Sequence, residues 1–139
     1  SQSPLPTTSP QPSTSPSIKL SEEALSEYLL KEVNAFRKSK GLSEATQDNN
    51  TCDFAKIRAG ELTTNNSHDG FTNRVNSKQL PYPSYSQITE NIAQNPNYKA
   101  VVPNWINSEG HAKNMLSDTP FICIKNNGNF FALEGWKPL

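Results

Sequence analysis

The sequence predicts a single mixed α and β domain, and three observations support this fold class. Apolar residues recur at helical spacing after Ser21 and again after Asp48, which indicates two amphipathic helices. Two runs near the end, FICI and NFFALEGW, are rich in β-branched and aromatic residues and predict strands. The length of 139 residues suffices for one domain with one hydrophobic core, and we therefore expect one site.

The first helix is predicted over residues 21–40. Glutamates stand in its first turn and basic residues in its last turn, which complements the helix dipole, and Gly41 follows as a stop signal. The apolar positions at helical spacing are Leu25, Leu29, Val33 and Phe36. The pattern therefore indicates one amphipathic helix that packs one face against a core.

A second helix is predicted to end near Thr63. Residues 48–51 offer candidates for its N-cap. Its apolar stripe consists of Cys52, Ala55, Ala59 and Leu62. A third helix is expected over residues 99–107, where Pro103 must stand in the first turn or kink the helix. Residues 63–97, which are polar and rich in turn formers, are expected to be mainly loops.

The two terminal strands are predicted to form a hairpin around an Asn-Gly turn in KNNG. An isolated hairpin is marginally stable, so a further strand must lie in the loop region, and residues 87–93 are the candidate. The strands then form a sheet on which the helices pack. The expected architecture is a mixed α and β sandwich rather than a helix bundle.

The composition excludes several classes of partner. Thirteen basic and thirteen acidic residues cancel, so no large field of either sign steers the chain to nucleic acid or to an anionic membrane. No apolar run approaches the roughly 18 residues that a membrane helix needs, and no signal segment opens the chain. We expect the chain as given to be soluble or already processed.

Residues 1–20 are predicted to be a disordered Ser/Thr/Pro-rich tether, and residues 21–139 the folded domain. The opening SQSPLPTTSPQPSTSPS has five prolines, no charge and one large aliphatic residue, too little apolar surface to offset the entropy of ordering. Such a spacer holds a domain away from a surface. A remnant of cloning or a frayed terminus is an equal alternative. A lipid-modified cysteine upstream would favour the tether, although this segment contains none.

The two histidines are candidates for a functional site. His68 in NNSHDGF and His111 in NSEGHAKN both lie in polar, turn-prone sequence and not on an apolar stripe. A lone histidine in such a place is more often a cap or a surface residue, so a third group is needed. Glu90 is that candidate. We expect Ile88 and Ile92 to point away from its carboxylate, which would then face a cavity or solvent.

Two imidazoles and one carboxylate match the ligand set of a catalytic zinc that keeps a fourth position for water. The predicted metal ligands are His68, Glu90 and His111, and the cofactor is a divalent metal such as Zn²⁺. Their wide spacing along the chain makes this a weak motif. Ser108 and Glu109 neighbour His111 and are expected to line the same cleft.

No catalytic nucleophile is assigned. Cys52 stands on an apolar helical stripe, where a small buried hydrophobic residue is the default. Cys52 and Cys123 both look like core positions, and two interpretations stay open: a disulfide that closes a loop of about 70 residues, or two buried thiols.

Several motifs in order resemble a bacterial member of the CAP superfamily of cysteine-rich secretory proteins, antigen 5 and pathogenesis-related proteins. The matching stretches are KEVNAFRKSKGL, CDFAKIRAGEL, SHDGF, TENIA, WINSEGHAKNML and FICIKNNGNFFALEGW. They cover essentially everything after Ser21. The resemblance implies a three-layer α-β-α sandwich, hence an α+β fold, and an extracytoplasmic domain, either secreted or tethered at the cell surface.

The resemblance also implies a central cleft with two histidines and two glutamates. His68, Glu90 and His111 fall on three of these positions. The second glutamate usually stands three residues after the tryptophan, where this chain has Ser108 after Trp105, with Glu109 one step on. Pro103 and Glu134 also depart from the usual pattern. The stretch WINSEGHAKNML is then interpreted as a helix end that presents His111 to the cleft.

The family has been linked to lipid or sterol binding, divalent metal binding, host-facing interaction and proteolysis, and fold analogy does not choose among these. The incomplete set of cleft glutamates and the lack of a positioned nucleophile favour a non-enzymatic, surface-exposed binding domain. Its expected partner is an extracellular protein or a lipid or sterol-like ligand. The alternative is a metal-dependent, peptidase-like hydrolase that uses the same cleft.

Overall fold

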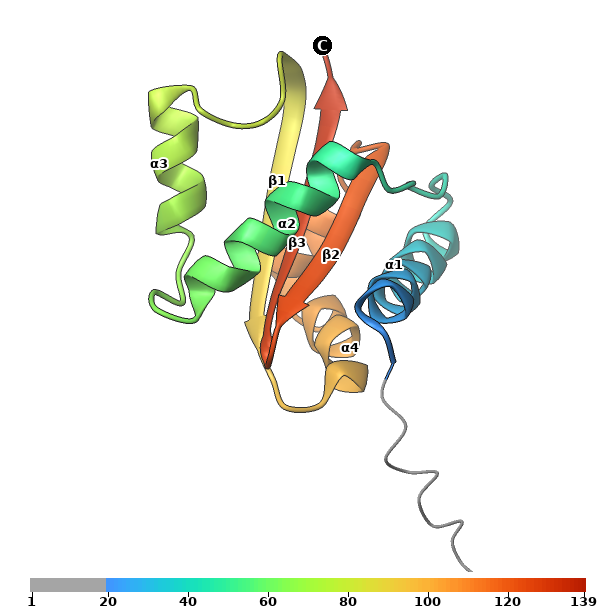
Figure 1. Ribbon diagram of the computed structural model, residues 1–139. Helices are drawn as coiled ribbons and strands as arrows, with labels where there is room; N and C mark the ends of the chain where they lie inside the picture. Colours follow the sequence, from blue (N-terminus) through green and yellow to red (C-terminus); the bar gives the residue numbers. More distant parts are fainter. Residues whose placement is uncertain (1–19) are drawn as a thin grey trace, which may run out of the picture.

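The computed structural model of the chain describes residues 20–139 (Figure 1). In chain order the elements are α1 (Glu22–Ser39), α2 (Asn49–Leu62), α3 (Asp69–Ser77), β1 (Tyr85–Gln94), η3 (Tyr98–Ala100), α4 (Val101–Ile106), α5 (Glu109–Met115), β2 (Phe121–Asn127) and β3 (Phe130–Pro138). The tether predicted for residues 1–20 lies, apart from Leu20, outside the described residues and stays a prediction. Among the described helices, none is long and apolar enough to cross a membrane.

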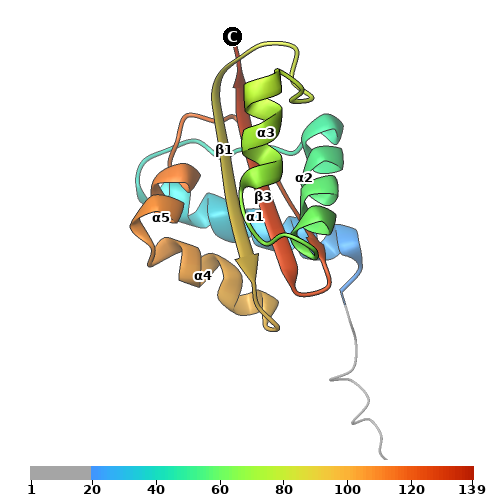
Figure 2. The ribbon, with the colours of Figure 1, turned by 90° about the vertical axis from the view of Figure 1, so that its left-hand side faces the viewer.

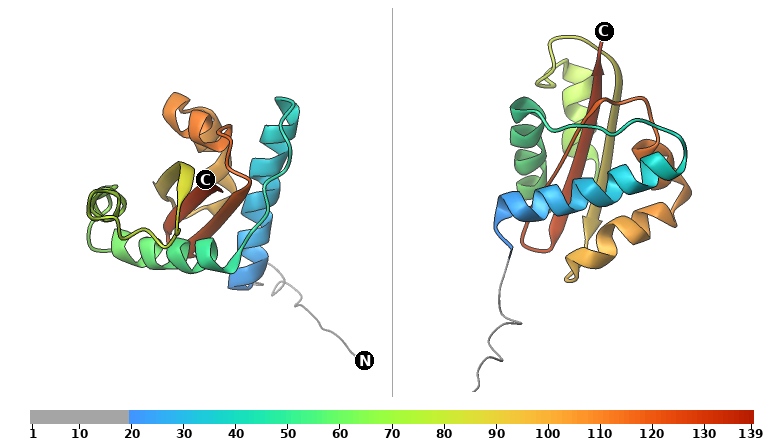
Figure 3. Two further views of the ribbon diagram at one scale, coloured as in Figure 1. Left: turned by 90° about the horizontal axis from the view of Figure 1, so that it is seen from above. Right: turned by 90° about the vertical axis from the view of Figure 1, so that its right-hand side faces the viewer.

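The three strands form one antiparallel sheet in the order β1-β3-β2, so the last strand of the chain lies in the middle. Helices α2 and α3 cover one face of this sheet, and α1, α4 and α5 cover the other, as the view from above shows (Figure 3). The prediction of a three-layer α-β-α sandwich is therefore confirmed.

The central strand β3 supplies the core on both sides of the sheet. Phe131 and Leu133 belong to the large apolar cluster with α1, α4 and α5, whereas Ala132 and Trp136 belong to smaller clusters with α2. Side chains of a strand alternate between its two faces, and a strand buried on both faces reads as a nearly continuous apolar run. This explains the composition of NFFALEGW.

The predictions for the first two helices are confirmed, and local chemistry explains their ends. The Ser21 hydroxyl accepts a hydrogen bond of 3.0 Å from the backbone N–H of Ala24, which caps the start of α1. Gly41 follows the helix with a φ of 81°, a conformation that glycine adopts without strain. Helix α2 begins after Asp48 and ends before Thr63, as its apolar stripe predicts.

The C-terminal hairpin and the strand at residues 87–93 are also confirmed, with one correction to the turn. Asn127 of β2 pairs with Phe130 of β3, so the two turn residues are Gly128 and Asn129 rather than Asn127 and Gly128. Gly128 has a φ of 58°, so glycine occupies the first central position of the turn, where a positive φ is required.

One expectation for the middle of the chain is wrong. Residues 63–97 are not mainly loop, because they contain α3 and the ten-residue strand β1. No residue of α3 is fully buried, so its sequence lacks the apolar stripe that would have predicted it. The helix expected over residues 99–107 is present as α4, which follows a 3₁₀ turn, and Pro103 stands in the first turn of α4 as predicted.

The two cysteines form a disulfide, which decides between the two interpretations left open by the sequence. The Cys52–Cys123 bond joins α2 to β2 across 71 positions of sequence, with the two Cα atoms 5.1 Å apart. It therefore fixes α2, which carries residues of the site described below, to the sheet.

Candidate functional site

A cleft of about 400 Å³ lies beside β1, at the outer edge of the sheet. In Figure 2 this strand runs between α3 and α5. His68, which precedes α3, lies on one side of the cleft, and residues of α5 lie on the other. The residues that line the cleft are His68, Glu90, Ser108, Gly110, His111, Lys113 and Asn114. The structure thus brings both histidines, Glu90 and Ser108 to one place, as the sequence predicts.

Glu90 is the buried anchor of the cleft. Its side chain is 1% exposed, and Arg58 of α2 donates to both of its oxygens, from Nε to Oε2 at 2.7 Å and from Nη2 to Oε1 at 3.0 Å. Burial alone would raise the pKa of Glu90, but hydrogen bonds from neighbouring groups, Arg58 and His68 among them, and the charge of Arg58 bring the pKa below its ordinary value. Glu90 is therefore a carboxylate whose negative charge is already compensated.

The expectation that Ile88 and Ile92 point away from Glu90 is wrong. Residues two apart in a strand share a face. Ile88 packs in the cluster of Phe54, Tyr82 and Trp136, and Ile92 packs with Ala59 and Leu62, so both isoleucines lie on the α2 side where Glu90 meets Arg58. The carboxylate meets a buried guanidinium flanked by apolar clusters, and Glu90 also contributes to the lining of the cleft.

His68 lies immediately before α3, and Glu90 orients its ring. Nδ1 of His68 is 2.8 Å from Oε1 of Glu90. Because an ionised carboxylate only accepts hydrogen bonds, Nδ1 must carry the proton and donate. In the neutral ring the lone pair then stands on Nε2. Arg58 also holds the loop before α3, since its Nη2 donates to the backbone oxygen of Ser67 at 2.8 Å.

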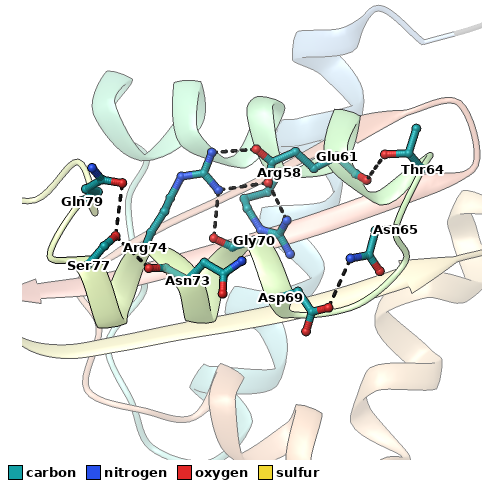
Figure 4. A pocket seen from close by; sticks show the side chains of 10 residues that line it. All are labelled: Arg58, Glu61, Thr64, Asn65, Asp69, Gly70, Asn73, Arg74, Ser77 and Gln79. Carbon is teal, nitrogen blue, oxygen red and sulfur yellow. Dashed lines mark hydrogen bonds and ion pairs between the residues drawn. The ribbon is translucent and has the colours of Figure 1, made fainter.

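Arg58 extends this contact into a chain of ion pairs between α2 and α3 (Figure 4). Glu61 accepts from Arg58 at 2.8 Å and from Arg74 at 2.6 Å. Hydrogen bonds from Arg74, followed by those from Arg58, lower the pKa of Glu61 to about 2. At Gly70 a Cβ atom would clash with the side chains of Glu61 and Arg58, so a glycine is needed for α3 to lie this close. The network attaches the loop of His68 to α2.

His111 lies on the opposite side of the cleft, in the first turn of α5. Its Nδ1 is 2.9 Å from the hydroxyl oxygen of Ser108, which precedes the helix. Burial, together with the charge of His68, lowers the pKa of His111, which favours the neutral ring near neutral pH. The interpretation of WINSEGHAKNML as a helix end is corrected: α4 ends at Ile106, and His111 lies in the first turn of a second helix, α5.

Side chains from α4 and α5 cap the free edge of β1. Asn114 donates to the backbone oxygen of Glu90 at 3.1 Å, and Trp105 donates from Nε1 to that of Ile92 at 3.1 Å. Asn91 in turn donates to the backbone oxygen of His111 at 3.1 Å. The first two bonds satisfy edge carbonyls of β1, and the bonds of Asn114 and Asn91 together fix α5 against the strand.

Glu109 is the predicted cleft residue that the structure does not place in the lining. It is the first residue of α5 and is exposed. Along a helix, adjacent residues point in different directions, so Glu109 does not share the face of Ser108 and His111. The expected second cleft glutamate is thus absent from the cleft lining, and Ser108 occupies its place beside His111.

The contacts of Glu90 also bear on the predicted metal ligands. Among residues 20–139, no group of three or more His, Cys, Asp or Glu side chains is arranged to hold a metal ion. Both oxygens of Glu90 already accept hydrogen bonds from Arg58, and Oε1 also faces His68, so this carboxylate fits the role of a hydrogen-bond partner better than that of a ligand. The donor atoms left for a cation are Nε2 of His68 and Nε2 of His111.

Arg58 is not predicted from the sequence, and Glu134 is noted there only as a departure from the family pattern. Arg58 lies between Ala55 and Leu62 on the helical stripe, at spacings of three and four, and a charged residue there is a signal of a buried ion pair. Glu134 interrupts an apolar strand, is 0% exposed and pairs in register with Glu90. A buried carboxyl in the middle of a sheet indicates a partner on the neighbouring strand.

Solved structures with the same fold come from several bacteria. An extracellular protein containing an SCP domain from Bacillus anthracis str. Ames superposes with a TM-score of 0.72 at 23% identity and covers 84% of this chain. An outer surface protein of Borrelia burgdorferi gives 0.71 at 23% identity over 88% of this chain and 98% of its own. A cysteine-rich secretory protein of Staphylococcus aureus gives 0.70 at 18% identity over 84% of this chain. At these identities the likeness shows the fold.

The chain spans 41% of the length of the Bacillus protein and 39% of the Staphylococcus protein. Among curated proteins, none matches the sequence. A sequence profile described as CAP, the cysteine-rich secretory protein family, matches residues 30–119, which include both histidines and Glu90. The chain therefore belongs to the cysteine-rich secretory protein (CAP) family.

Proposed function

We propose that this chain is a binding domain exposed outside the cell, and that its cleft holds a divalent cation between His68 and His111. The location is supported by the relatives of known structure, described as an extracellular protein in Bacillus anthracis and as an outer surface protein in Borrelia burgdorferi. The cation, when bound, supplies a Lewis-acidic centre to which an oxygen or nitrogen atom of an external partner can bind.

The orientation of the two imidazoles is the observation that carries the proposal. In each ring Nδ1 has a hydrogen-bond partner within the protein, Glu90 for His68 and Ser108 for His111. Histidines that bind metals commonly donate their other ring N–H to such a partner, which fixes the tautomer and leaves Nε2 for the ion. Glu90 acts on His68 in this scheme and does not itself bind the cation.

A lipid or sterol-like ligand is less well supported at this cleft. The lining is made of histidine, serine, glycine, lysine, asparagine and one glutamate, and it offers no aliphatic or large aromatic side chain other than imidazole. Sites for such ligands are mostly apolar. We therefore propose that the external partner presents a polar group, such as a carboxylate or a carbonyl, to the cleft.

The alternative of a metal-dependent hydrolase lacks a general base. Such a base must lie within hydrogen-bond reach of the attacking water. Glu90 is buried and occupied by Arg58 and His68, and Glu109 is not part of the cleft lining. These contacts support recognition rather than turnover.

The test is isothermal titration of the metal-free chain with Zn²⁺. We expect one ion per chain in the wild type and at least a tenfold weaker affinity in both His68→Ala and His111→Ala, because each variant removes one of two imidazole donors. Glu109→Gln is the matched control and should bind as the wild type does. Wild-type chains that bind no Zn²⁺, or histidine variants that bind as tightly as the control, would show that the cleft is not a cation site.

A second assay separates recognition from hydrolysis. The Zn²⁺-loaded chain is incubated with a library of peptides and esters, beside Glu90→Ala and His111→Ala variants. We expect no turnover above that of free Zn²⁺. Turnover that needs both residues and disappears with a chelator would establish the hydrolase instead.

A further inference from the structure

A second carboxyl group lies behind the cleft, at a position where the family motifs do not predict one. Glu134 of β3 pairs in register with Glu90 of β1, and its side chain is completely buried. Cross-strand partners place their side chains on the same face of a sheet. The two carboxyls therefore lie side by side on the α2 face, one of them in the cleft lining and the other behind it.

Neither oxygen of Glu134 receives a hydrogen bond from an N–H or O–H group of the described residues. The neighbouring positive charge is that of Arg58, whose N–H groups donate to other residues. Nε and Nη2 donate to Glu90, and Nη1 donates to Glu61. An ionised carboxylate in such a place would be buried without a donor, which is strongly unfavourable. A neutral carboxylic acid avoids this cost and has one proton to donate.

The groups around Glu134 favour the neutral form. Burial and then the neighbouring Glu90 raise the pKa of Glu134 well above its ordinary value, against the opposing charges of Arg58 on α2 and Arg74 on α3. Glu90, with its donors from Arg58 and His68, is the carboxyl of the pair that stays ionised.

We propose that Glu134 is a positioning residue of the cleft, a neutral carboxylic acid that donates a hydrogen bond to the Glu90 carboxylate. Glu90 is then held by Arg58, His68 and Glu134 together, on α2, on the loop before α3 and on β3. Three donors from three elements leave the carboxylate one orientation, and that orientation fixes the tautomer and the plane of the His68 ring. The effect of Glu134 on cation binding rests on the proposed function, but the hydrogen bond from Glu134 to Glu90 does not.

The first measurement is the infrared difference spectrum between the metal-free wild type and Glu134→Gln at pH 7. We expect the carbonyl stretch of a protonated carboxylic acid in the wild type and its loss in the variant. If the wild type shows no such band, Glu134 is ionised and the proposal is overturned. Because no cation is present, a failed Zn²⁺ titration would leave this result standing.

The second measurement is the NMR resonance of the Nδ1 proton of His68, which reports the hydrogen bond to Glu90. Glu134→Gln should keep this resonance in place, because an amide N–H replaces the acid O–H as donor. Glu134→Leu removes the donor, so Glu90 accepts fewer hydrogen bonds and the one from His68 becomes stronger. The resonance of the His68 Nδ1 proton should therefore move downfield. If the leucine variant does not fold, the glutamine variant and the infrared band still decide.

Two results would contradict the positioning role. A resonance that stays unchanged in a folded Glu134→Leu variant would show that Glu134 does not act on Glu90. An upfield shift in Glu134→Gln would mean that a negative charge had been removed, and hence that Glu134 was ionised in the wild type.

Discussion

The two faces of the sheet differ in what holds them together. On the face covered by α1, α4 and α5, one cluster of twelve buried apolar residues forms a continuous core. On the face covered by α2 and α3, two smaller apolar clusters lie on either side of three buried ionisable residues, Arg58, Glu90 and Glu134. The first face is built for stability, and the second accepts buried charge in order to position a cleft.

The strand β3 shows this difference between adjacent residues. Leu133 joins the continuous core, whereas Glu134, its neighbour, faces Glu90 on the other side. Buried polar groups stabilise a fold little beyond what apolar packing would give, but their loss one at a time is costly because a partner is left without compensation. The effects of mutations on the two faces should therefore differ in kind as well as in size.

The largest effect is expected on the charged face, for Arg58→Met. This variant leaves Glu90 buried without its cation, and we expect it to lower the free energy of unfolding by about 3–5 kcal/mol. The double variant Arg58→Met with Glu90→Gln removes both charges and should recover part of that loss. Urea denaturation measures both. A single variant that loses less than about 1 kcal/mol would show that the ion pair is not needed to compensate Glu90.

The disulfide connects α2, on the charged face, to β2 of the sheet, and its removal should have a similar effect. In the chain-entropy account a cross-link across 71 positions stabilises a fold by about 4 kcal/mol. We expect Cys52→Ala with Cys123→Ala to lower the urea midpoint accordingly. Reduction of the wild-type chain with dithiothreitol should give the same midpoint as the double variant, and equal midpoints for oxidised and reduced wild type would contradict the prediction.

On the apolar face, Leu29→Ala should lower the free energy of unfolding by about 3 kcal/mol, since a fully buried leucine leaves a cavity when truncated. The NMR resonance of the His68 Nδ1 proton should stay in place, because the contacts of Glu90 with Arg58 and His68 lie on the other face of the sheet. Ile57→Ala, at a position on α2 that is 53% exposed, is the control and should change stability by less than about 0.5 kcal/mol. A moved His68 resonance in the leucine variant would mean that the two faces are not independent.

The apolar face is also the one that local sequence patterns predict well. Helical spacing predicts α1, and the runs FICI and NFFALEGW predict β2 and β3. The residues of the cleft, His68, Glu90 and His111, are predicted as a set because their motifs occur in the order of a known family. Their convergence at one edge of the sheet comes from the topology, since β1 is an edge strand.

The charged face is predicted poorly because its partners lie far apart in the sequence. Arg58 contacts Glu90 across 32 positions, and no local periodicity reports such a pair. Helix α3 is short and has no fully buried residue, and the ion pair of Arg74 with Glu61 joins it to α2 alongside the packing of Phe71. Glu134 looks like an interruption of a strand until the register with Glu90 is known. In each case the physical reason for the residue is another residue that only the fold brings near.

The smallest effect is expected at the solvent-facing end of the charged network, where Glu61 makes stability depend on pH. Its pKa is lowered to about 2 in the folded protein, first by the hydrogen bond from Arg74. A carboxylate with a lowered folded pKa binds fewer protons folded than unfolded. Its contribution is therefore fully present above the ordinary range near 4.5 and is lost as the pH falls towards 2. Between pH 7 and pH 3, urea denaturation should show a smaller loss of unfolding free energy for Glu61→Gln than for the wild type. Arg74→Met should also reduce the loss of unfolding free energy between pH 7 and pH 3, because it removes the main cause of the lowered pKa of Glu61. If both variants lose as much stability as the wild type, the acid-sensitive groups lie elsewhere.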